Sequence, residues 1–386
     1  MKVAIDVRGC LGPGAGINVY TAELIKALAG LDVELSMWFS ARQIEEAKAR
    51  LVPDLRALEP RVPVLTTKLS NQVLYSYPAQ ALWRHWPRWL PPPKWLPRGI
   101  DVYHAPYWPL PLDREIPMVL TIHDLIPLRH PEWFTARMRS ELRTVTALAT
   151  RAAHVITDSH ATREDVLALT RVRPERVTTV HLGVNEAMFR DVGEEERQAV
   201  RERHKLDRPY IMSLSTRDPR KNLGRLIDAY DLLCERLGPE WDLVLIGAGG
   251  WGQDDVAPRL SRQRTGRVVV TGHIPREDIL PLLSGASALS YVSLAEGFGL
   301  PPLEAMAAGC PVVTSNVSSL PEVVGDAALT VDPLDTEAIA DGLRRVLTDE
   351  ALAADLRRRG RERARSFTWE RTARETLEVY KRAVAG

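Results

Sequence analysis

The sequence predicts an α/β protein built from two Rossmann-like, doubly wound domains of parallel sheet. Short β-branched runs such as KVAIDV and DLVLIGA alternate with longer helical patterns, as in βαβ units. The chain has 386 residues, of which 45% are hydrophobic, which suits two cores better than one. A charged stretch near residue 190 separates two series of strands. We expect the carboxyl ends of both sheets to face a cleft.

The first domain is expected over residues 1–190. A strand in KVAIDV leads through a glycine-rich turn into a helix that Gly30 ends. Further strands are predicted in DVYHAP, PMVLTIHD and AAHVITDS, and RVTTVHLGV closes the domain. The second domain, 191–367, is expected to contain strands in YIMSLST, DLVLIGA, RVVVTGH, ALSYVSL, PVVTSN and AALTVDP. A final helix over 368–386 could cap either domain, with a return to the first as one option.

Composition excludes several classes. The formal net charge of +1 gives no field that favours nucleic acid. The three cysteines are scattered, which predicts reduced thiols in the cytoplasm and no structural zinc. The chain opens on a strand rather than a signal peptide, and no apolar run approaches the roughly 20 residues of a membrane span. We therefore expect a cytoplasmic protein, with peripheral contact at the inner face of the membrane left open.

That option comes from residues 82–98, where tryptophans alternate with arginine and lysine among prolines. Such a pattern suits contact with a membrane interface or with a hydrophobic acceptor molecule. It equally suits a proline-rich excursion whose tryptophans cover the core of their own domain.

Three turns point to a phosphate group. The segment STRDPRKNL presents Arg220 and Lys221 between a strand and a helix, where two cations suit a diphosphate. Glycine-rich turns in GPGAGINVY and GFGLPP each open a helix, whose free N–H groups favour anions. The residues concerned in these two turns are Gly14, Gly16, Gly297, Phe298, Gly299 and Leu300.

Two carboxylates flank the second glycine-rich turn, although carboxylates repel phosphate. An ionised carboxylate only accepts hydrogen bonds and therefore pairs with hydroxyl donors. Glu304 lies in the expected helix, where it could hold a diol such as ribose, and Glu296 lies before the turn, where it could reach a hydroxylated ring. The implied ligand is a nucleoside diphosphate joined to a sugar.

The stretch EGFGLPPLEAMAAGCPVV, with two glutamates eight positions apart, resembles retaining glycosyltransferases of family 4, which have the two-domain GT-B fold. GINVYTAELIKAL, TIHDLIPLRHPEWF, VITDSHAT, TRDPRKNL, VVTGHIPREDILPLL and SLPEVVGDAAL also resemble that family, in the same order. By this resemblance Glu296 contacts the donor sugar, Glu304 holds the ribose hydroxyls, and Arg220 with Lys221 binds the diphosphate.

The resemblance also makes His123, in TIHD, the active-site histidine near the transferred sugar and the acceptor. It places Gly14 and Gly16 near the donor phosphates and Ile274 where backbone groups meet the base. Many relatives carry arginine at the position of Ser215, so Arg217 or Arg220 is expected to supply that charge. The first-domain turn reads GINVY where relatives are close to GIGRY.

The reaction implied is sugar transfer to an acceptor hydroxyl with retention of the anomeric configuration. Glu296 could act as a nucleophile, but the resemblance favours a front-face route in which the leaving phosphate takes the acceptor's proton. The sequence has no Asp-x-Asp element, so we expect no metal and no cofactor besides the nucleotide-sugar donor.

The residues of PRKN and IHDLIPLRHPEWF most resemble the branch of the family that uses GDP-mannose, which makes mannose the favoured sugar. The acceptor is a saccharide or a polyprenyl-linked glycan. The alternatives are transfer from a UDP-sugar, a sugar-nucleotide epimerase or hydrolase on the same scaffold, and a non-catalytic protein that binds nucleotide-sugar.

Overall fold

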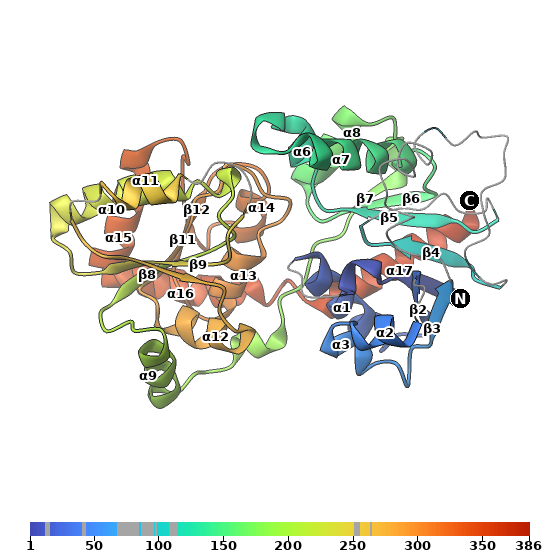
Figure 1. The fold of residues 1–386 in the computed structure, drawn as a ribbon, viewed down its shortest axis with the longest axis horizontal. Helices are drawn as coiled ribbons and strands as arrows, with labels where there is room; N and C mark the ends of the chain where they lie inside the picture. The colour runs from blue at the N-terminus through green and yellow to red at the C-terminus, as the bar shows by residue number, and fades with distance from the viewer. Residues whose placement is uncertain are drawn as a thin grey trace. The chain divides into compact units, whose positions relative to one another are not determined.

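The computed structural model describes residues 1–11, 16–40, 44–67, 85, 96, 99–107, 115–250, 255–262 and 265–386. They form two compact units (Figure 1). Unit 1 comprises Met1–Arg129, Ala136–Gly183 and Trp369–Gly386, and unit 2 comprises His130–Thr135 and Val184–Thr368. The tryptophan-rich pattern of 82–98 lies outside the described residues, apart from positions 85 and 96.

Unit 1 is built on a seven-stranded sheet with the order β3-β2-β1-β4-β5-β6-β7, and every adjacent pair of strands is parallel. Its strands are β1 (Lys2–Asp6), β2 (Glu34–Ser40), β3 (Val64–Thr67), β4 (Val102–Ala105), β5 (Met118–Ile122), β6 (His154–Thr157) and β7 (Val177–Thr179). Its α-helices are α1 (Ile17–Leu28), α2 (Ile44–Ala49), α3 (Pro53–Arg56), α6 (Ile126–Arg129), α7 (Ala136–Ala149), α8 (His160–Leu169) and α17 (Trp369–Ala385).

Unit 2 is built on a six-stranded sheet with the order β10-β9-β8-β11-β12-β13, again parallel throughout. Its strands are β8 (Tyr210–Leu214), β9 (Asp242–Ile246), β10 (Val268–Gly272), β11 (Ala288–Tyr291), β12 (Val312–Ser315) and β13 (Leu329–Val331). Its α-helices are α9 (Glu194–Arg203), α10 (Leu223–Leu237), α11 (Val256–Leu260), α12 (Arg276–Gly285), α13 (Leu300–Ala307), α14 (Leu320–Val324), α15 (Thr336–Thr348) and α16 (Glu350–Ala364).

The central strands are buried along their whole length because helices cover both faces of the sheet. All residues of β4, β5, β9 and β11 are buried, as expected of strands in a doubly wound parallel sheet. The two parallel sheets confirm the fold class that the alternating pattern predicts.

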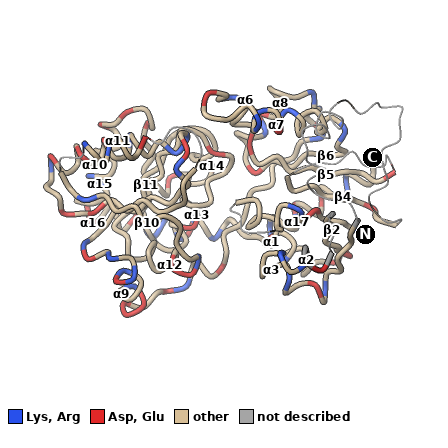
Figure 2. Tube along the Cα trace, viewed as in Figure 1, with Lys and Arg blue, Asp and Glu red and all other residues tan. Residues whose placement is uncertain are grey.

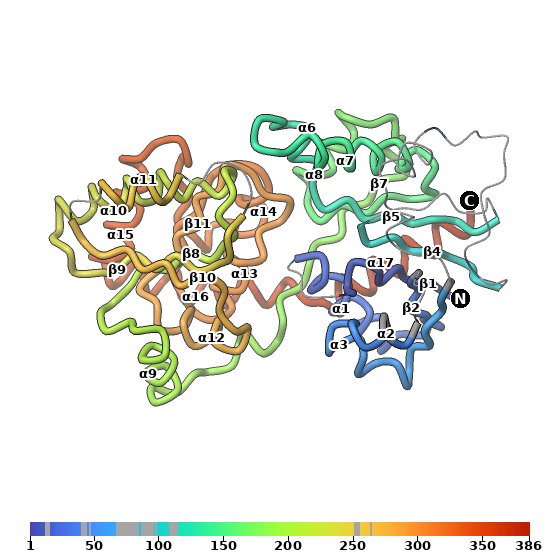
Figure 3. Tube along the Cα trace, in the orientation of Figure 1, coloured from blue at the N-terminus to red at the C-terminus, as the bar shows by residue number. Residues whose placement is uncertain are grey.

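The C-terminal helix α17 packs on the first unit. It lies against α1 and against β4, β5 and β6 (Figure 3). Tyr380 of this helix is fully buried, and its hydroxyl group lies 2.7 Å from Nδ1 of His104 on β4. An amphipathic helix therefore crosses from the end of unit 2 to complete the core of unit 1.

Charged residues of both signs are interspersed along the described parts of each unit (Figure 2), in keeping with the near-zero net charge. Among the described residues, no helix has the length and apolar character that crossing a membrane requires.

Candidate active site

Strand order in unit 2 brings together two segments that are far apart in the sequence. Strands β8 and β11 are neighbours, and parallel strands end at the same edge of a sheet. The 3₁₀ turn η5 (Pro219–Lys221) follows β8, and Glu296 follows β11. Arg220 and Lys221 therefore meet Glu296 at the carboxyl edge of the sheet, where ligands bind in this fold class.

The three side chains form a buried ion-pair cluster. Nζ of Lys221 donates to Oε1 of Glu296 at 2.6 Å, and Nη1 of Arg220 donates to Oε2 at 2.7 Å. The Lys221 and Glu296 side chains are only 7% and 8% exposed. Asp218 lies on the other side of Arg220, with Oδ1 at 3.3 Å from Nε. Both oxygens of Glu296 are thus occupied by cations.

These contacts fix the charge on Glu296. Burial alone would raise the pKa of its carboxyl group, but the charges of Arg220 and Lys221 outweigh that effect and lower the pKa to about 2. Burial lowers the pKa of Lys221, and the charge of Glu296 opposes that shift. At neutral pH Glu296 is ionised and weakly basic.

Tyr291, the last residue of β11, is a partner of this cluster that sequence reasoning missed. Its hydroxyl oxygen accepts a hydrogen bond from Nζ of Lys221 at 2.7 Å, and its ring lies 5.0 Å from the same nitrogen. An ammonium group has three N–H bonds. Because Glu296 and Tyr291 take two of them, the third has a defined direction.

The backbone around Glu296 is held by two serines before α14, which sequence reasoning also missed. Ser318 Oγ accepts from the Glu296 N–H at 3.0 Å and donates to its carbonyl at 2.6 Å. Ser319 Oγ contacts the carbonyls of Glu296 and Phe298 at 3.0 and 2.7 Å. The turn over 296–298 is therefore rigidly positioned.

The GFGLPP turn opens α13, as predicted, although the helix begins at Leu300. Gly299 is its N-cap with φ +115°, a conformation that favours glycine, and a Cβ there would lie 2.8 Å from Leu320. Since Pro301 and Pro302 have no N–H group, Leu300 supplies the amide donor of the first turn.

Glu304 lies in α13 and is half-buried. Burial raises the pKa of its carboxyl group, and the positive charge of Arg276 opposes that shift. No hydrogen bond or ion pair with another described residue engages this carboxylate. It is therefore available to a donor that arrives with a ligand, in contrast to Glu296.

The remaining predicted residues of unit 2 lie near the same edge. Ile274 is buried in the loop between β10 and α12, two positions after Gly272. Arg217 follows β8 and pairs with Gly249 in a short parallel bridge. Arg220, rather than Arg217, is the arginine whose guanidinium group contacts Glu296.

In unit 1, His123 follows β5 and is almost buried. Its Nδ1 lies 2.6 Å from Oδ2 of Asp158, and its Nε2 lies 2.7 Å from the carbonyl oxygen of Pro106. Burial alone would lower the pKa of His123, but the charge of Asp158 and the hydrogen bonds outweigh it, so the pKa is raised. Tyr20 of α1 meets the ring edge-on at 4.8 Å.

His104 differs from His123 in its partners. Its ring nitrogens contact the hydroxyl groups of Tyr380 at 2.7 Å and Thr121 at 2.8 Å. Burial lowers the pKa of His104 to about 3. It is a neutral core histidine, which agrees with a structural role.

The first-domain turn is only partly described. Gly14 lies outside the described residues, whereas Gly16 is the N-cap of α1 with φ +51°. Asn18, in the first turn of that helix, is buried.

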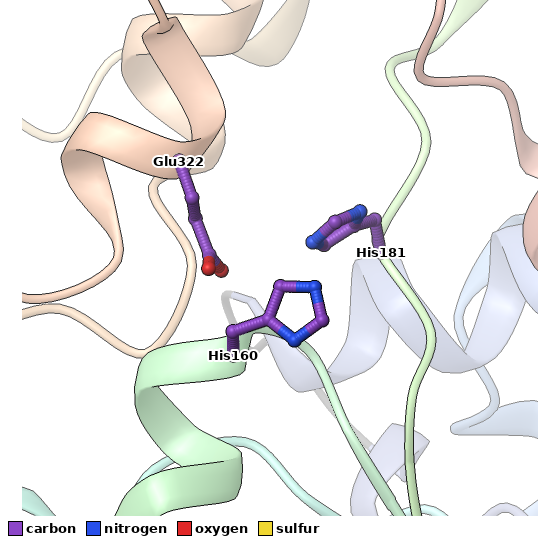
Figure 4. A group of neighbouring side chains, drawn as sticks. All are labelled: His160, His181 and Glu322. Carbon is purple, nitrogen blue, oxygen red and sulfur yellow. The ribbon is translucent and has the colours of Figure 1, made fainter.

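Two further histidines of unit 1 approach each other (Figure 4). The rings of His160 and His181 meet edge to face, with centroids 5.5 Å apart. Figure 4 also draws Glu322, which belongs to unit 2. Because the positions of the two units relative to one another are not determined, no metal site is assigned to the three.

Comparisons with known proteins cover the whole chain. Residues 14–187 match the family model described as Glycosyltransferase Family 4, and residues 194–363 match the model described as Glycosyl transferases group 1. The chain is 32% identical to O-antigen chain mannosyltransferase B of Escherichia coli, over 99% of this chain and 100% of that protein. It is 31% identical to the serotype-specific mannosyltransferase WbdA of Escherichia coli, over 68% of this chain and 33% of that protein. A solved structure of Anabaena Alr3699/HepE in complex with UDP-glucose is similar in fold, with a TM-score of 0.73 and 18% identity over 98% of each chain.

Proposed function

This chain belongs to glycosyltransferase family 4, whose members are retaining glycosyltransferases with the GT-B fold, and we propose that it transfers mannose from GDP-mannose. The acceptor in this proposal is a hydroxyl group of a saccharide or of a lipid-linked glycan. Two observations support mannose as the sugar: both Escherichia coli relatives are mannosyltransferases, and the segments around Lys221 and His123 resemble the branch that uses GDP-mannose.

The proposal depends on one observation, the buried cluster of Arg220, Lys221 and Glu296. In glycosyl transfer, negative charge develops on the departing diphosphate. Cations and backbone N–H groups that are fixed in advance stabilise such charge most effectively in a site without water. The third N–H of Lys221 and the amide of Leu300 are donors suited to this role, and they make a divalent ion unnecessary.

The same cluster supports a front-face route. A carboxylate nucleophile needs a free oxygen and some basicity. Both oxygens of Glu296 are engaged by cations, and the lowered pKa makes the group a poor nucleophile. We assign Glu296 to accept a hydrogen bond from the donor sugar. The leaving phosphate oxygen takes the acceptor's proton as the new glycosidic bond forms and the sugar–phosphate bond breaks.

The carboxylate of Glu304 is assigned to the ribose. It has no hydrogen-bond partner among the described residues, and two ribose hydroxyl groups would supply the missing donors. The raised pKa of Glu304 fits this role, since a bound diol stabilises the charged form that burial alone disfavours. Ile274 and Gly16 are assigned to backbone contacts with the base and the phosphates.

The test is nucleoside diphosphate release from GDP-mannose, UDP-glucose and ADP-glucose, with and without mannose-terminated oligosaccharides. We expect release from GDP-mannose that depends on an acceptor and that persists in EDTA. A thermal shift gives an independent reading, because a ligand at 100 times its Kd adds about 2.7 kcal/mol of stability. A preference for UDP-glucose would overturn the assignment of GDP-mannose as the donor. Sugar release without any acceptor would indicate hydrolysis instead of transfer. Lys221→Met is the inactive control.

A further inference from the structure

His104 lies on β4 and His123 follows the neighbouring strand β5, yet the surroundings of the two rings differ in one respect. His104 faces two hydroxyl groups, which can donate or accept hydrogen bonds, so one proton on its ring satisfies both contacts. His123 faces a carboxylate and a backbone carbonyl, which contribute lone pairs and no N–H group. Contacts of 2.6 and 2.7 Å to two such acceptors each require a proton.

If Asp158 is ionised, a neutral imidazole, which carries one proton, would place two lone pairs against each other at one of these contacts. The arrangement is satisfied when Nε2 donates to Pro106 and a proton lies between Nδ1 and Asp158. From this geometry we infer that His123 works as an imidazolium hydrogen-bond donor, held by Asp158 as a positioning residue, and not as a general base. The inference rests on the proposed function, which puts His123 at the reacting sugar.

Asp158 is suited to this task because it has little else to bind. It lies at the end of β6 and is 2% exposed, and its second oxygen, Oδ1, has no hydrogen-bond partner among the described residues. A buried carboxylate is costly unless it is paired. Burial raises the pKa of Asp158 above its usual value, and the charge and hydrogen bond of His123 are the main effects that oppose this shift.

Other titratable groups surround His123 and Asp158 on neighbouring elements. Asp124, the next residue, favours the cation; His181, after β7, favours the anionic form of Asp158. His104 on β4 stays neutral, and the edge of Tyr20 from α1 carries no charge because burial raises the pKa of its phenol group. Burial alone would lower the pKa of His123, but Asp158, the carbonyl of Pro106 and Asp124 together raise it above its usual value, in agreement with the geometry.

This assignment has a chemical consequence for the transfer. An imidazolium group has no lone pair, so it cannot take the proton of the acceptor hydroxyl group. Its Nε2–H can exchange the carbonyl of Pro106 for an oxygen of the sugar or of the phosphate. A charge-assisted hydrogen bond of that kind is roughly twice as strong as a neutral one. The acceptor's proton must then leave by another route, as the front-face mechanism requires.

The first test is spectroscopic and needs no activity. In the full chain labelled with ¹⁵N-histidine, we expect both ring nitrogens of His123 to carry protons at pH 7. His104 and His154, whose pKa values burial lowers to about 3 and about 4, are internal references for a neutral ring. His123→Gln identifies the signals. An unprotonated ring nitrogen on wild-type His123 at pH 7 would overturn the inference, whether or not the protein transfers mannose.

The second test is the pH profile of transfer by the wild type and by Asp158→Asn. An amide keeps one acceptor but removes the charge, so His123 should lose its second proton near neutral pH. We expect turnover to fall on the alkaline side, and this fall to begin at lower pH in the variant. For each unit by which the pKa of His123 lies below the assay pH, the fraction of imidazolium falls about tenfold. A variant that loses activity on the acid side instead would identify a general base. If the wild type shows no transfer at all, the proposed function fails while the spectroscopic result still decides the protonation of His123.

Discussion

Nζ of Lys221 lies 2.6 Å from Oε1 of Glu296, although the two residues are 75 positions apart in the chain. Both side chains are nearly inaccessible to solvent. Removing one partner of a buried ion pair leaves an uncompensated charge and costs about 3–5 kcal/mol. Substitutions here therefore change both the stability of unit 2 and its chemistry, and experiments must separate the two effects.

Glu296→Gln should lower turnover by about 10²–10³-fold, because it removes the charge that holds two cations in place. It should also lower the melting temperature. The double variant Glu296→Gln/Lys221→Met should recover part of that stability, since it buries no unpaired charge beyond that of Arg220, but should recover no activity. Steady-state rates and thermal unfolding of the wild type and the two variants decide this. Wild-type turnover in Glu296→Gln would refute the assignment of this residue.

Tyr291→Phe tests whether the direction of the Lys221 ammonium group matters. The substitution keeps the ring beside Nζ and removes the hydroxyl acceptor. We expect a stability loss of about 1 kcal/mol and a drop in turnover of roughly tenfold to 100-fold, as small displacements of a reacting geometry cause.

The matched control is Tyr210→Phe, on the neighbouring strand β8. The hydroxyl group of Tyr210 donates to the carbonyl of Leu282 at 2.6 Å and is equally buried. Its loss should cost a similar amount of stability and leave turnover unchanged. Equal effects of the two variants on turnover would mean that Tyr291 supports only the fold.

The fold class could be predicted from the sequence because alternating apolar runs and helical patterns report their own local structure. The family could be predicted because EGFGLPPLEAMAAGCPVV and the other quoted motifs resemble it. The unit against which the last helix packs could not be predicted in this way. An amphipathic stripe predicts that a face is buried without indicating what covers it. The contact of Tyr380 with His104, across 276 positions, decides that α17 completes unit 1.

In the candidate site, too, some residues could be predicted from the sequence and others could not. Glu296, Glu304 and Lys221 stand in recognisable motifs, and the structure brings Lys221 and Glu296 into contact. Asp158 lies in VITDSHAT and Tyr291 in ALSYVSL, but neither segment marks the residue as part of a site, since their importance arises from strands that pair side by side. A weak signal exists for both, because each stands at the carboxyl end of a predicted strand, where ligands bind in this fold class.

Unit 1 should lose stability in mild acid because of His104. Its pKa is about 3 in the fold and about 6.5 in an unfolded chain, so the unfolded state binds the proton first. The stability that depends on neutral His104 is complete above pH 6.5 and is lost as the pH falls towards 3. Urea unfolding at pH 7, 6 and 5 should show a steep decline that is shallower in His104→Gln. His130→Gln, at a side chain that is 42% exposed, should retain the steep decline.

Glu296 gives unit 2 a second acid-sensitive group with the same sign. Its pKa of about 2 lies below the usual 4.5, so its contribution is complete above pH 4.5 and is lost as the pH falls towards 2. Proteolysis of the native chain at stepwise lower pH should therefore release fragments of unit 1 before those of unit 2. The reverse order would contradict these assignments.

Gly299→Ala tests the turn at the start of α13. Gly299 has φ +115° and Gly238, the C-cap of α10, has φ +81°, so alanine at either position is strained by about 1–3 kcal/mol. A Cβ at Gly299 also lies 2.8 Å from Leu320, whereas a Cβ at Gly238 meets nothing within 4 Å. Gly299→Ala must therefore displace either the fully buried Leu320 side chain or the turn that carries the amide of Leu300. We expect calorimetry to show about tenfold weaker GDP binding in Gly299→Ala and unchanged binding in Gly238→Ala. Backbone strain is common to the two variants, and only the contact with Leu320 differs. Equal affinities for GDP would therefore show that diphosphate binding does not depend on the amide of Leu300.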